Sequence, residues 1–343
     1  MTNDLFYNDI TISIKELMLT SFAKTHIGQR TTNEDFILVD EKLGLYIVAD
    51  GVGGRKKGDL ASKIACQKVR QCIEQGNMLD YAVYEAHGAL VDQIESNGSK
   101  HEMATTIAAV LFSDNKYQIS WVGDTRVYLW DQKLKLLTRD DTYVQQLYDD
   151  NRIYLEDLVA HPDRNIITQA LGMRRKEVTI HSNFGTLEKN QILMICSDGL
   201  YEIANELDII NELDRQKGIT ELTEKLVNIA VKNDGMDNIS LISIKSESNT
   251  KQPDRSFKPH VVREFELKAN TIKNDRPAKK HQHADPNLVN ITVLQELTKQ
   301  EQALLESAAD QWNPKIERKT NVKTPLILIG LVILVITFLY FLL

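Results

Sequence analysis

The sequence is poor in cysteine, with three among 343 residues, and it lacks internal repeats and low-complexity tracts. An odd number of cysteines cannot be fully paired in disulfides. Cys66 and Cys72 are too far apart in the sequence to form a paired metal-binding motif. The sequence therefore predicts that Cys66, Cys72 and Cys196 are buried, reduced thiols, as is usual for cysteines in the cytoplasm.

We expect no secretory signal peptide, because the first residues show no basic stretch followed by an apolar one. The other end is strongly apolar: residues 325–343 read PLILIGLVILVITFLYFLL, without a charge. A helix of this length spans a bilayer. A buried helix of a soluble domain is the weaker alternative, because such a helix would carry a polar stripe. The sequence predicts a transmembrane helix over 325–343.

Basic residues precede this apolar run, namely Lys315, Arg318, Lys319 and Lys323. Lysine and arginine beside a membrane helix favour the cytoplasmic side. We therefore expect a single-pass protein that contacts membrane lipid through a C-terminal anchor, with the rest of the chain in the cytoplasm.

Charge and composition divide the chain before the apolar run. Residues 1–244 carry 26 Lys+Arg against 37 Asp+Glu, and residues 245–324 carry 15 against 11. The acidic first part disfavours nucleic-acid binding. We predict one domain over 1–246 and a polar, partly disordered linker over 247–324. Apolar residues at helical spacing near 287–310 indicate a short amphipathic helix, for which a solvated helix is an equal alternative.

Four aspartates lie at the ends of strand-like apolar runs. These are Asp50 after 45–49, Asp198 after 191–196, Asp124 after 119–122 and Asp237 before 239–244. Glycine adjoins three of them and lets the backbone approach a ligand closely. A single Asp-Gly pair is common in turns, but four aspartates at strand ends in one domain are a more specific sign of a functional site. Carboxylates gathered at one rim repel each other, and Mg²⁺ or Mn²⁺ relieves that repulsion because these ions prefer oxygen ligands.

The motifs that contain these aspartates follow one order along the chain. They are Arg30-Thr-Thr-Asn-Glu34-Asp35, Ala49-Asp50-Gly51-Val52-Gly53-Gly54, Ala104-Thr105-Thr106, Gly123-Asp124-Thr125-Arg126, Ser197-Asp198-Gly199-Leu200 and Asp237-Asn238-Ile239-Ser240. This set, within about residues 20–245, resembles the metal-dependent serine/threonine protein phosphatases of the type 2C class, in their bacterial form. The resemblance implies an α+β fold, a four-layer α-β-β-α sandwich of two antiparallel sheets flanked by helices. The sequence is compatible with helices over 58–75 and 79–96.

The resemblance also implies roles for single residues. Asp50 bridges two Mn²⁺ or Mg²⁺ ions, the Gly51 carbonyl adds a ligand, and Asp198 and Asp237 complete the first shells. Asp124 matches an aspartate that holds a third, weaker metal in many microbial members.

Further roles follow from the same resemblance. Arg30 matches the arginine that binds phosphate, a role that suits the guanidinium fork. Glu34 holds metal-bound water, and Asp35 lies beside it. Asn238 orients its neighbouring loop, while the pair Thr105 and Thr106 is structural.

The chain departs from the family at Val52, where animal members often have a histidine proposed as the general acid. A metal-bound water is our preferred proton donor there. Residues 138–172 resemble the flap that borders the substrate cleft. His161 lies in this flap, and we expect it to serve loop packing, as we do for His26 and His87.

The reaction implied is hydrolysis of phosphoserine or phosphothreonine by a water that bridges two ions, without a phosphoenzyme and without a cysteine or serine nucleophile. Two alternatives stay open, a phosphoprotein-binding pseudo-phosphatase and a phosphatase of small phosphate esters. Expected partners are phosphorylated proteins in a signalling pathway, including a transmembrane serine/threonine kinase or its substrates.

Overall fold

The computed structural model describes residues 19–52, 57–96, 103–173, 177–215, 218–247 and 258–265. The predicted membrane span at 325–343, the predicted helix at 287–310 and the glycines Gly53 and Gly54 lie outside these described residues. Among the residues that are described, no helix is both long enough and apolar enough to cross a bilayer.

Two antiparallel sheets stack face to face. One contains β1 (Leu19–His26), β10 (Ile239–Ser246), β9 (Ile192–Cys196), β6 (Arg126–Trp130), β7 (Leu134–Leu136) and β11 (Arg263–Phe265), in this spatial order. The other contains β2 (Phe36–Asp40), β3 (Leu45–Ala49), β4 (Ile107–Ser113), β5 (Lys116–Val122) and β8 (His181–Thr186). We refer to them as the six-stranded and the five-stranded sheet.

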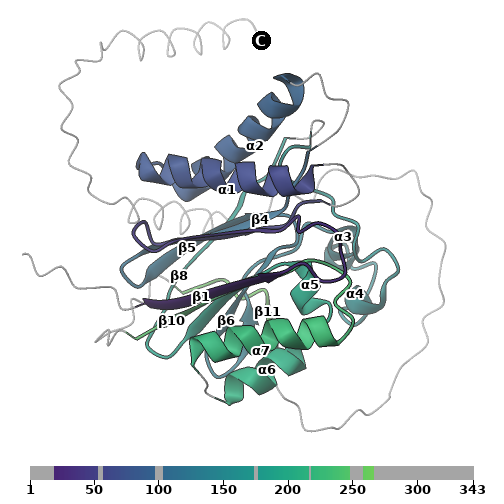
Figure 1. Cartoon of the computed structure of the whole chain (residues 1–343). Coiled ribbons are helices and arrows are strands. Elements are labelled where there is room, and N and C mark those ends of the chain that lie inside the picture. The colour runs from purple at the N-terminus through teal and green to yellow at the C-terminus, as the bar shows by residue number, and fades with distance from the viewer. Residues whose placement is uncertain are drawn as a thin grey trace, which may run out of the picture. The chain divides into compact units, whose positions relative to one another are not determined.

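Helices cover the outer face of each sheet, so that the order of layers is α-β-β-α (Figure 1). The helices are α1 (Gly58–Glu74), α2 (Leu79–Ser96), α3 (Tyr143–Asp149), α4 (Asp157–Ala160), α5 (Asp198–Tyr201), α6 (Glu206–Asp214) and α7 (Ile219–Lys232). α1 and α2 cover the five-stranded sheet, and α6 and α7 cover the six-stranded one. The predicted sandwich of two antiparallel sheets flanked by helices is confirmed.

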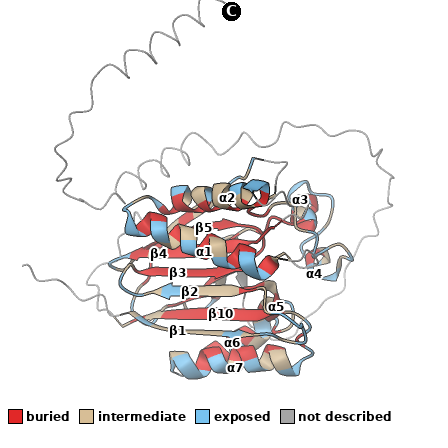
Figure 2. Ribbon diagram, turned by 45° about the horizontal axis from the view of Figure 1, so that its top comes forward, coloured by how far each residue is buried: buried red, intermediate tan, exposed pale blue. Residues whose placement is uncertain are grey.

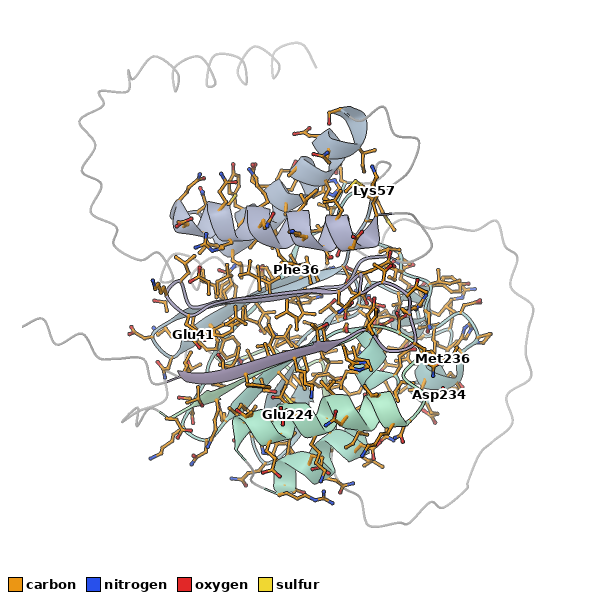
Figure 3. All side chains as sticks on the ribbon, viewed as in Figure 1. Phe36, Glu41, Lys57, Glu224, Asp234 and Met236 are labelled. Atoms are coloured by element: carbon orange, nitrogen blue, oxygen red, sulfur yellow. The ribbon has the colours of Figure 1, made fainter. Side chains whose placement is uncertain are left out.

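The central strands read as continuous apolar runs because both of their faces are buried (Figure 2). In β3, Leu45 and Ile47 pack towards α1 and α2, whereas Tyr46 and Val48 pack between the sheets. This alternation is the period of two of a strand. Figure 3 shows Phe36 of β2 lying beneath α1, where it packs against the same core. The sheet ends are thus fixed from both sides, which gives the residues that follow them defined positions.

Residues 258–265, which lie inside the predicted linker, add β11 to the edge of the six-stranded sheet. The main-chain N–H of Val262 donates to Leu136 O at 2.8 Å. Asn183 of β8 is buried, and its side chain donates to His260 O at 2.9 Å and accepts from His260 N at 3.1 Å. The same amide donates to Leu137 O at 2.8 Å. Asn183 therefore joins this segment to both sheets.

Replacing Asn183 with alanine is expected to lower the free energy of unfolding by about 1–3 kcal/mol, because the carbonyl of the buried Leu137 and the main chain of His260 lose their partner. Urea denaturation of the full chain measures this change. Asn228→Ala, at an exposed position of α7, is the matched control and is expected to change stability by less than about 0.5 kcal/mol. Equal effects of the two substitutions would show that Asn183 does not hold the segment.

Candidate metal centre and active site

The aspartates that the sequence places at strand ends lie near one end of the sandwich. Asp50 follows β3, Asp198 begins α5 directly after Ser197 and β9, and Asp124 lies between β5 and β6. Asp237 precedes β10. In Figure 3, Lys57, Asp234 and Met236 lie at this end of the molecule, and Glu41 lies at the other end. The loops that carry the candidate ligands thus gather on one side.

Main-chain hydrogen bonds fix the turn that carries Asp50. Its carbonyl accepts from Thr105 Oγ1 and from Thr106 N, each at 2.8 Å. Gly51 N donates to Glu34 O at 3.1 Å. A Cβ on Gly51 would lie 2.5 Å from the main chain of Gly58, so only glycine fits there. The two threonines hold the main chain of Asp50 and not its carboxylate, in agreement with the structural role predicted for them.

Asn238 holds the loop that carries Arg30 and Glu34. Its Oδ1 accepts from Glu34 N at 2.7 Å, and its Nδ2 donates to Ile27 O at 2.9 Å and to Thr32 O at 3.1 Å. Asn238 is buried, and these three bonds use most of the capacity of its amide. The predicted orienting role of Asn238 agrees with these contacts.

Arg30 forms an ion pair with Asp237, with Arg30 Nη2 at 2.7 Å from Asp237 Oδ2. The other oxygen of Asp237 accepts from Asn238 N at 2.8 Å. Half of the Arg30 side chain is exposed. The half-exposed guanidinium therefore lies next to a predicted metal ligand.

The carboxylates raise one another's pKa values. Burial raises the pKa of Asp50 and of Asp198 well above the usual range, and nearby aspartates, including Asp124 and Asp237, raise both further. Burial likewise raises the pKa of Asp124 to about 7, with Asp140 adding to the effect. Residues distant in sequence thus share one electrostatic environment that disfavours their ionisation.

Asp35 belongs to the same group. Burial raises its pKa to about 6, against the hydrogen bonds from Ser240 and Ser197 that lower it. Ser197 Oγ donates to Asp35 Oδ2 at 2.9 Å. Burial also raises the pKa of Glu34, while Arg30 lowers it. Asp35 and Glu34 therefore extend the acidic cluster towards Arg30.

Within this cluster of aspartates, two buried oxygens have no hydrogen-bond partner among the residues that the structure describes, Asp198 Oδ1 and Asp35 Oδ1. Buried polar atoms are normally satisfied, so such atoms call for a partner. A hard divalent cation fits this donor set, because Mg²⁺ and Mn²⁺ prefer carboxylate, carbonyl and water oxygens. Within the described residues, no three His, Cys, Asp or Glu side chains already form a metal-ligand cluster. The roles of Asp50, Gly51, Asp124, Asp198 and Asp237 as metal ligands remain predictions.

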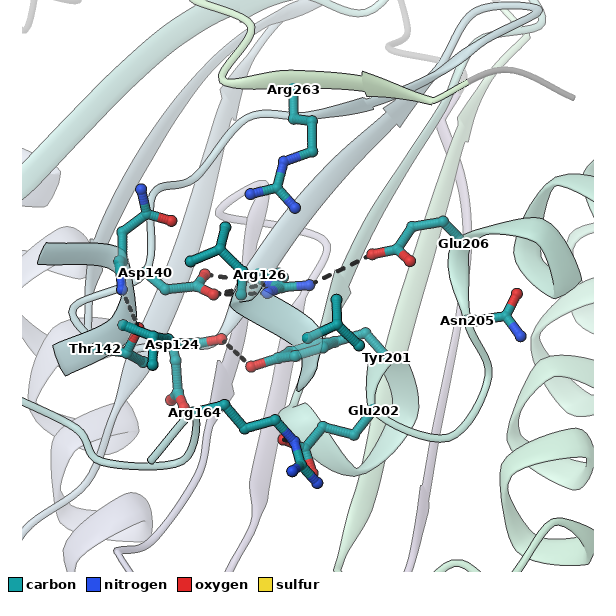
Figure 4. Close-up of a pocket in the computed structure, with 14 residues that line it drawn as sticks. Asp124, Arg126, Asp140, Thr142, Arg164, Tyr201, Glu202, Asn205, Glu206 and Arg263 are labelled. Atoms are coloured by element: carbon teal, nitrogen blue, oxygen red, sulfur yellow. Dashed lines mark hydrogen bonds and ion pairs between the residues drawn. The ribbon is translucent and has the colours of Figure 1, made fainter. Parts of the chain in front are cut away.

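A cavity of about 110 Å³ adjoins Asp124 (Figure 4). Arg126 lies across it, with bonds of 2.7–3.1 Å to Asp140 and a 3.6 Å ion pair to Glu206. The Arg126 guanidinium lies 3.7 Å from the centre of the Tyr201 ring, and Tyr201 Oη donates to Asp124 O at 3.0 Å. Arg126 and Tyr201 therefore connect α5, which begins at Asp198, to the turn that carries Asp124. Sequence reasoning missed Tyr201, whose position four residues into a short helix carries no signal of this contact.

The three cysteines are buried and unpaired, as predicted. Burial raises the pKa of the Cys196 thiol far above its usual value, which opposes a nucleophilic role. Val52 donates its main-chain N–H to Ala104 O at 3.0 Å and supplies no acidic group in place of the histidine of other members.

Three described histidines, His26, His87 and His161, have a ring nitrogen bonded to a main-chain N–H. His161 Nδ1 accepts from Asp163 N at 3.1 Å, and the rings of His161 and Tyr143 are roughly perpendicular with centroids 6.4 Å apart. His26 and His87 likewise accept main-chain hydrogen bonds, from Gly28 N and Gly172 N. This agrees with the packing role predicted for His161.

Comparison with known proteins identifies the family. Residues 23–241 match the family model of protein phosphatase 2C. The serine/threonine protein phosphatase PstP of Mycobacterium tuberculosis is 30% identical over 234 residues, which are 66% of this chain and 45% of that protein. The chain therefore matches less than half the length of this relative.

Solved structures agree with this result. A crystal structure of the M. tuberculosis phosphatase PstP/Ppp has a TM-score of 0.62 at 30% identity and covers 67% of this chain and 99% of that one. The catalytic domain of PstP in complex with two manganese ions has a TM-score of 0.59 at 28% identity, and the match covers 67% of this chain and 99% of that one. The chain belongs to the protein phosphatase 2C family, a class of serine/threonine protein phosphatases that use Mn²⁺ or Mg²⁺.

Proposed function

We propose that this chain hydrolyses phosphoserine and phosphothreonine in proteins by direct attack of water at a site that holds two Mn²⁺ or Mg²⁺ ions. The observation that carries the proposal is the shared environment of Asp35, Asp50, Asp124 and Asp198, whose pKa values are all raised by burial. A cluster of this kind costs stability unless cations neutralise it. Ion binding therefore best explains why the chain has this cluster of buried carboxylates.

The chain's own groups divide the work. Asp50, the Gly51 carbonyl, Asp198 and Asp237 would hold the ions, and Asp124 would hold a third. Bound ions of this type supply an acidified water as nucleophile and neutralise charge on the phosphoryl oxygens. Glu34 and Asp35 would accept hydrogen bonds from water held in the site.

Arg30 would bind the phosphate. Its guanidinium bonds to Asp237 Oδ2, and a cation held by Asp237 would weaken this ion pair because it neutralises the carboxylate. Positive charge at Asp237 would release the Arg30 fork, which can then grip two phosphate oxygens. Cation binding and phosphate binding are thereby coupled through Asp237.

The proposal is tested by hydrolysis of a phosphothreonine peptide by the purified full chain. We expect turnover with Mn²⁺, loss of turnover in excess EDTA and recovery when Mn²⁺ is restored. Full activity in excess chelator would contradict the proposal. A phosphotyrosine peptide and p-nitrophenyl phosphate serve as comparisons, and a preference for small esters over the phosphothreonine peptide would favour the small-molecule alternative.

Replacing Arg30 with alanine is expected to raise KM for the phosphothreonine peptide about tenfold to a hundredfold, because a charge-assisted bond of about 1.5–3 kcal/mol is lost. The KM of Arg30→Lys is expected to lie between the values of the wild type and of Arg30→Ala, since lysine keeps the charge but lacks the paired N–H donors of the guanidinium. Arg70→Ala, which removes a half-exposed arginine on α1 paired with Asp40, is the control. An unchanged KM in Arg30→Ala would exclude Arg30 from phosphate binding.

The pseudo-phosphatase alternative is disfavoured because the chain retains a carboxylate at each position of the predicted ligand set, Asp50, Asp198 and Asp237. A phosphoprotein-binding module without catalysis would have no need of all three. Binding of phosphopeptide without any turnover across a series of divalent cations would favour it again.

We further propose that the enzyme is tethered by residues 325–343 at the cytoplasmic face of a membrane, where it opposes a serine/threonine kinase. The uncharged run and the basic residues before it support the tether. Tethering would raise the enzyme's concentration near membrane-bound substrates. Recovery of the full chain in the carbonate-washed membrane fraction is expected. Recovery of the full chain in the soluble fraction would contradict the tether. Phosphoproteomics of cells carrying Asp198→Asn would identify the sites whose phosphorylation increases when the enzyme is inactive.

A further inference from the structure

Asp141 is a buried carboxylate that the proposed chemistry does not use. It is 8% exposed and directly follows Asp140. Its two oxygens accept hydrogen bonds from three separate segments. Oδ2 accepts from Gly123 N at 2.8 Å and from Gln169 Nε2 at 3.0 Å, and Oδ1 lies 2.9 Å from His181 Nε2. One side chain thus joins β8, the turn after β5 and the returning end of the flap.

The first of these contacts fixes the turn that presents Asp124. Besides the bond from Gly123 N, Asp141 N donates to Gly123 O at 3.0 Å, so both main-chain groups of Gly123 are bound to one residue. Gly123 has φ +98°, and a Cβ there would lie 2.6 Å from the Thr106 side chain. The turn therefore needs glycine and a partner that holds its unusual conformation. Asp124 is the next residue, so Asp141 fixes the main chain directly before it.

The second contact fixes the end of the flap, residues 166–172. Thr168 N donates to Asp141 O at 2.8 Å, and Gln169 is held by Thr179 through bonds of 2.7 and 2.9 Å. Leu171 exchanges two main-chain bonds with Thr105, whose hydroxyl bonds to the Asp50 carbonyl. The returning flap therefore lies between Asp141 and the turn that carries Asp50.

The third contact attaches Asp141 to the rigid part of the fold. His181 belongs to β8, and its ring stacks on Trp121 of β5, with centroids 5.2 Å apart and planes at 26°. Trp121 Nε1 donates to Arg139 O at 2.9 Å. His181 is thus held by the five-stranded sheet, and Asp141 transmits that position to the turn and the flap.

We propose that Asp141 is a positioning residue, which aligns the Asp124 carboxylate for ion binding and holds the flap end against the active site. The inference rests on the proposed function, since it assigns Asp141 a part in the same metal site. We assign Asp141 no ligand role, because Gly123, Gln169 and His181 already bond to its two oxygens. Groups that orient metal ligands commonly change metal affinity tenfold to a hundredfold when removed.

The test compares Asp141→Ala and Asp141→Asn in the full chain. Mn²⁺ binding is measured by electron paramagnetic resonance of free Mn²⁺, with thermal unfolding and kcat and KM for a phosphothreonine peptide as further readouts. Asp141→Ala is expected to raise the dissociation constant of the most weakly bound Mn²⁺ ion by about tenfold or more. Asp141→Asn is expected to restore binding to within about threefold, because its amide oxygen can accept from Gly123 N while its NH₂ donates to a neutral His181. Asp150→Ala, at an exposed position of the same flap, is the control.

Should Asp141→Ala not fold, His181→Phe supplies the second variant. Phenylalanine keeps a ring against Trp121 and removes the bond to Asp141, so weakened Mn²⁺ binding at a native melting temperature supports the proposal. Unchanged Mn²⁺ stoichiometry and affinity in the folded variants, with only a lower melting temperature, would show a merely structural role and overturn it. Absence of Mn²⁺ binding in the wild-type chain would instead reject the proposed function itself.

Discussion

Asp198→Asn is expected to lower kcat for the phosphothreonine peptide by about a thousandfold or more. Asp198 is a predicted ligand whose Oδ1 is buried without a hydrogen-bond partner among the described residues. Ions in such a site supply several kcal/mol of charge stabilisation, and each 1.36 kcal/mol corresponds to a factor of ten in rate. Steady-state kinetics at saturating Mn²⁺ measures the effect. Asp214→Asn, at the exposed end of α6, is the matched control.

The same substitution is expected to stabilise the metal-free protein. The carboxylate of Asp198 is disfavoured by burial and by Asp124 and Asp237, so a neutral amide of the same shape removes part of this cost. Urea denaturation in EDTA should therefore show a higher midpoint for Asp198→Asn than for the wild type. A catalytic loss accompanied by an equal loss of metal-free stability would indicate that Asp198 is structural.

The second large effect is a fall in metal-free stability as pH rises from about 4 to about 7. The pKa of Asp35 is raised to about 6 and that of Asp124 to about 7, whereas an unfolded aspartate titrates near 3.9. Between these values the folded state binds more protons than the unfolded state, so stability is greatest below the unfolded pKa and is lost as pH rises through the folded pKa. Asp50 and Asp198 shift in the same direction.

Mn²⁺ should reverse this trend, because it binds the ionised carboxylates. Tighter binding of Mn²⁺ at higher pH stabilises the folded state more. Melting curves at pH 5 and pH 8, each with EDTA or with Mn²⁺, measure both effects. We expect the increase in Tm on adding Mn²⁺ to be several-fold larger at pH 8. Equal increments at the two pH values, or metal-free stability that rises from pH 4 to pH 7, would contradict a cluster of mutually repelling carboxylates.

The strands and helices that the sequence predicts best are those whose burial follows a regular pattern along the chain. β3 and α2 have the predicted bounds, and β9 and α1 differ by one residue, because a doubly buried strand or an amphipathic helix carries its own pattern. β1 and β2 are only partly buried and show no such run. β11 lies in a polar stretch that carries no strand pattern. Its position is fixed by pairing with β7 and by the hydrogen bond from Asn183 to His260 O.

The site shows the same division. The four aspartates are recognisable because a strand end and, for three of them, a glycine mark each one in the sequence. The pairing of Arg30 with Asp237, 207 residues apart, has no local signal. Asp141 was missed for the same reason, since its partners Gly123 and His181 are 18 and 40 residues away. Contacts that depend on the packing of several segments cannot be inferred from the spacing of residues in one of them.

The central claim is that aspartates from separate loops jointly bind the catalytic ions. The most direct measurement is a crystal structure of the chain grown with Mn²⁺, with anomalous difference maps collected at the manganese edge. We predict two strong peaks in contact with Asp50, Asp198 and Asp237, with Arg30 no longer paired to Asp237. Peaks elsewhere, or no peak beside Asp50 at millimolar Mn²⁺, would contradict the account.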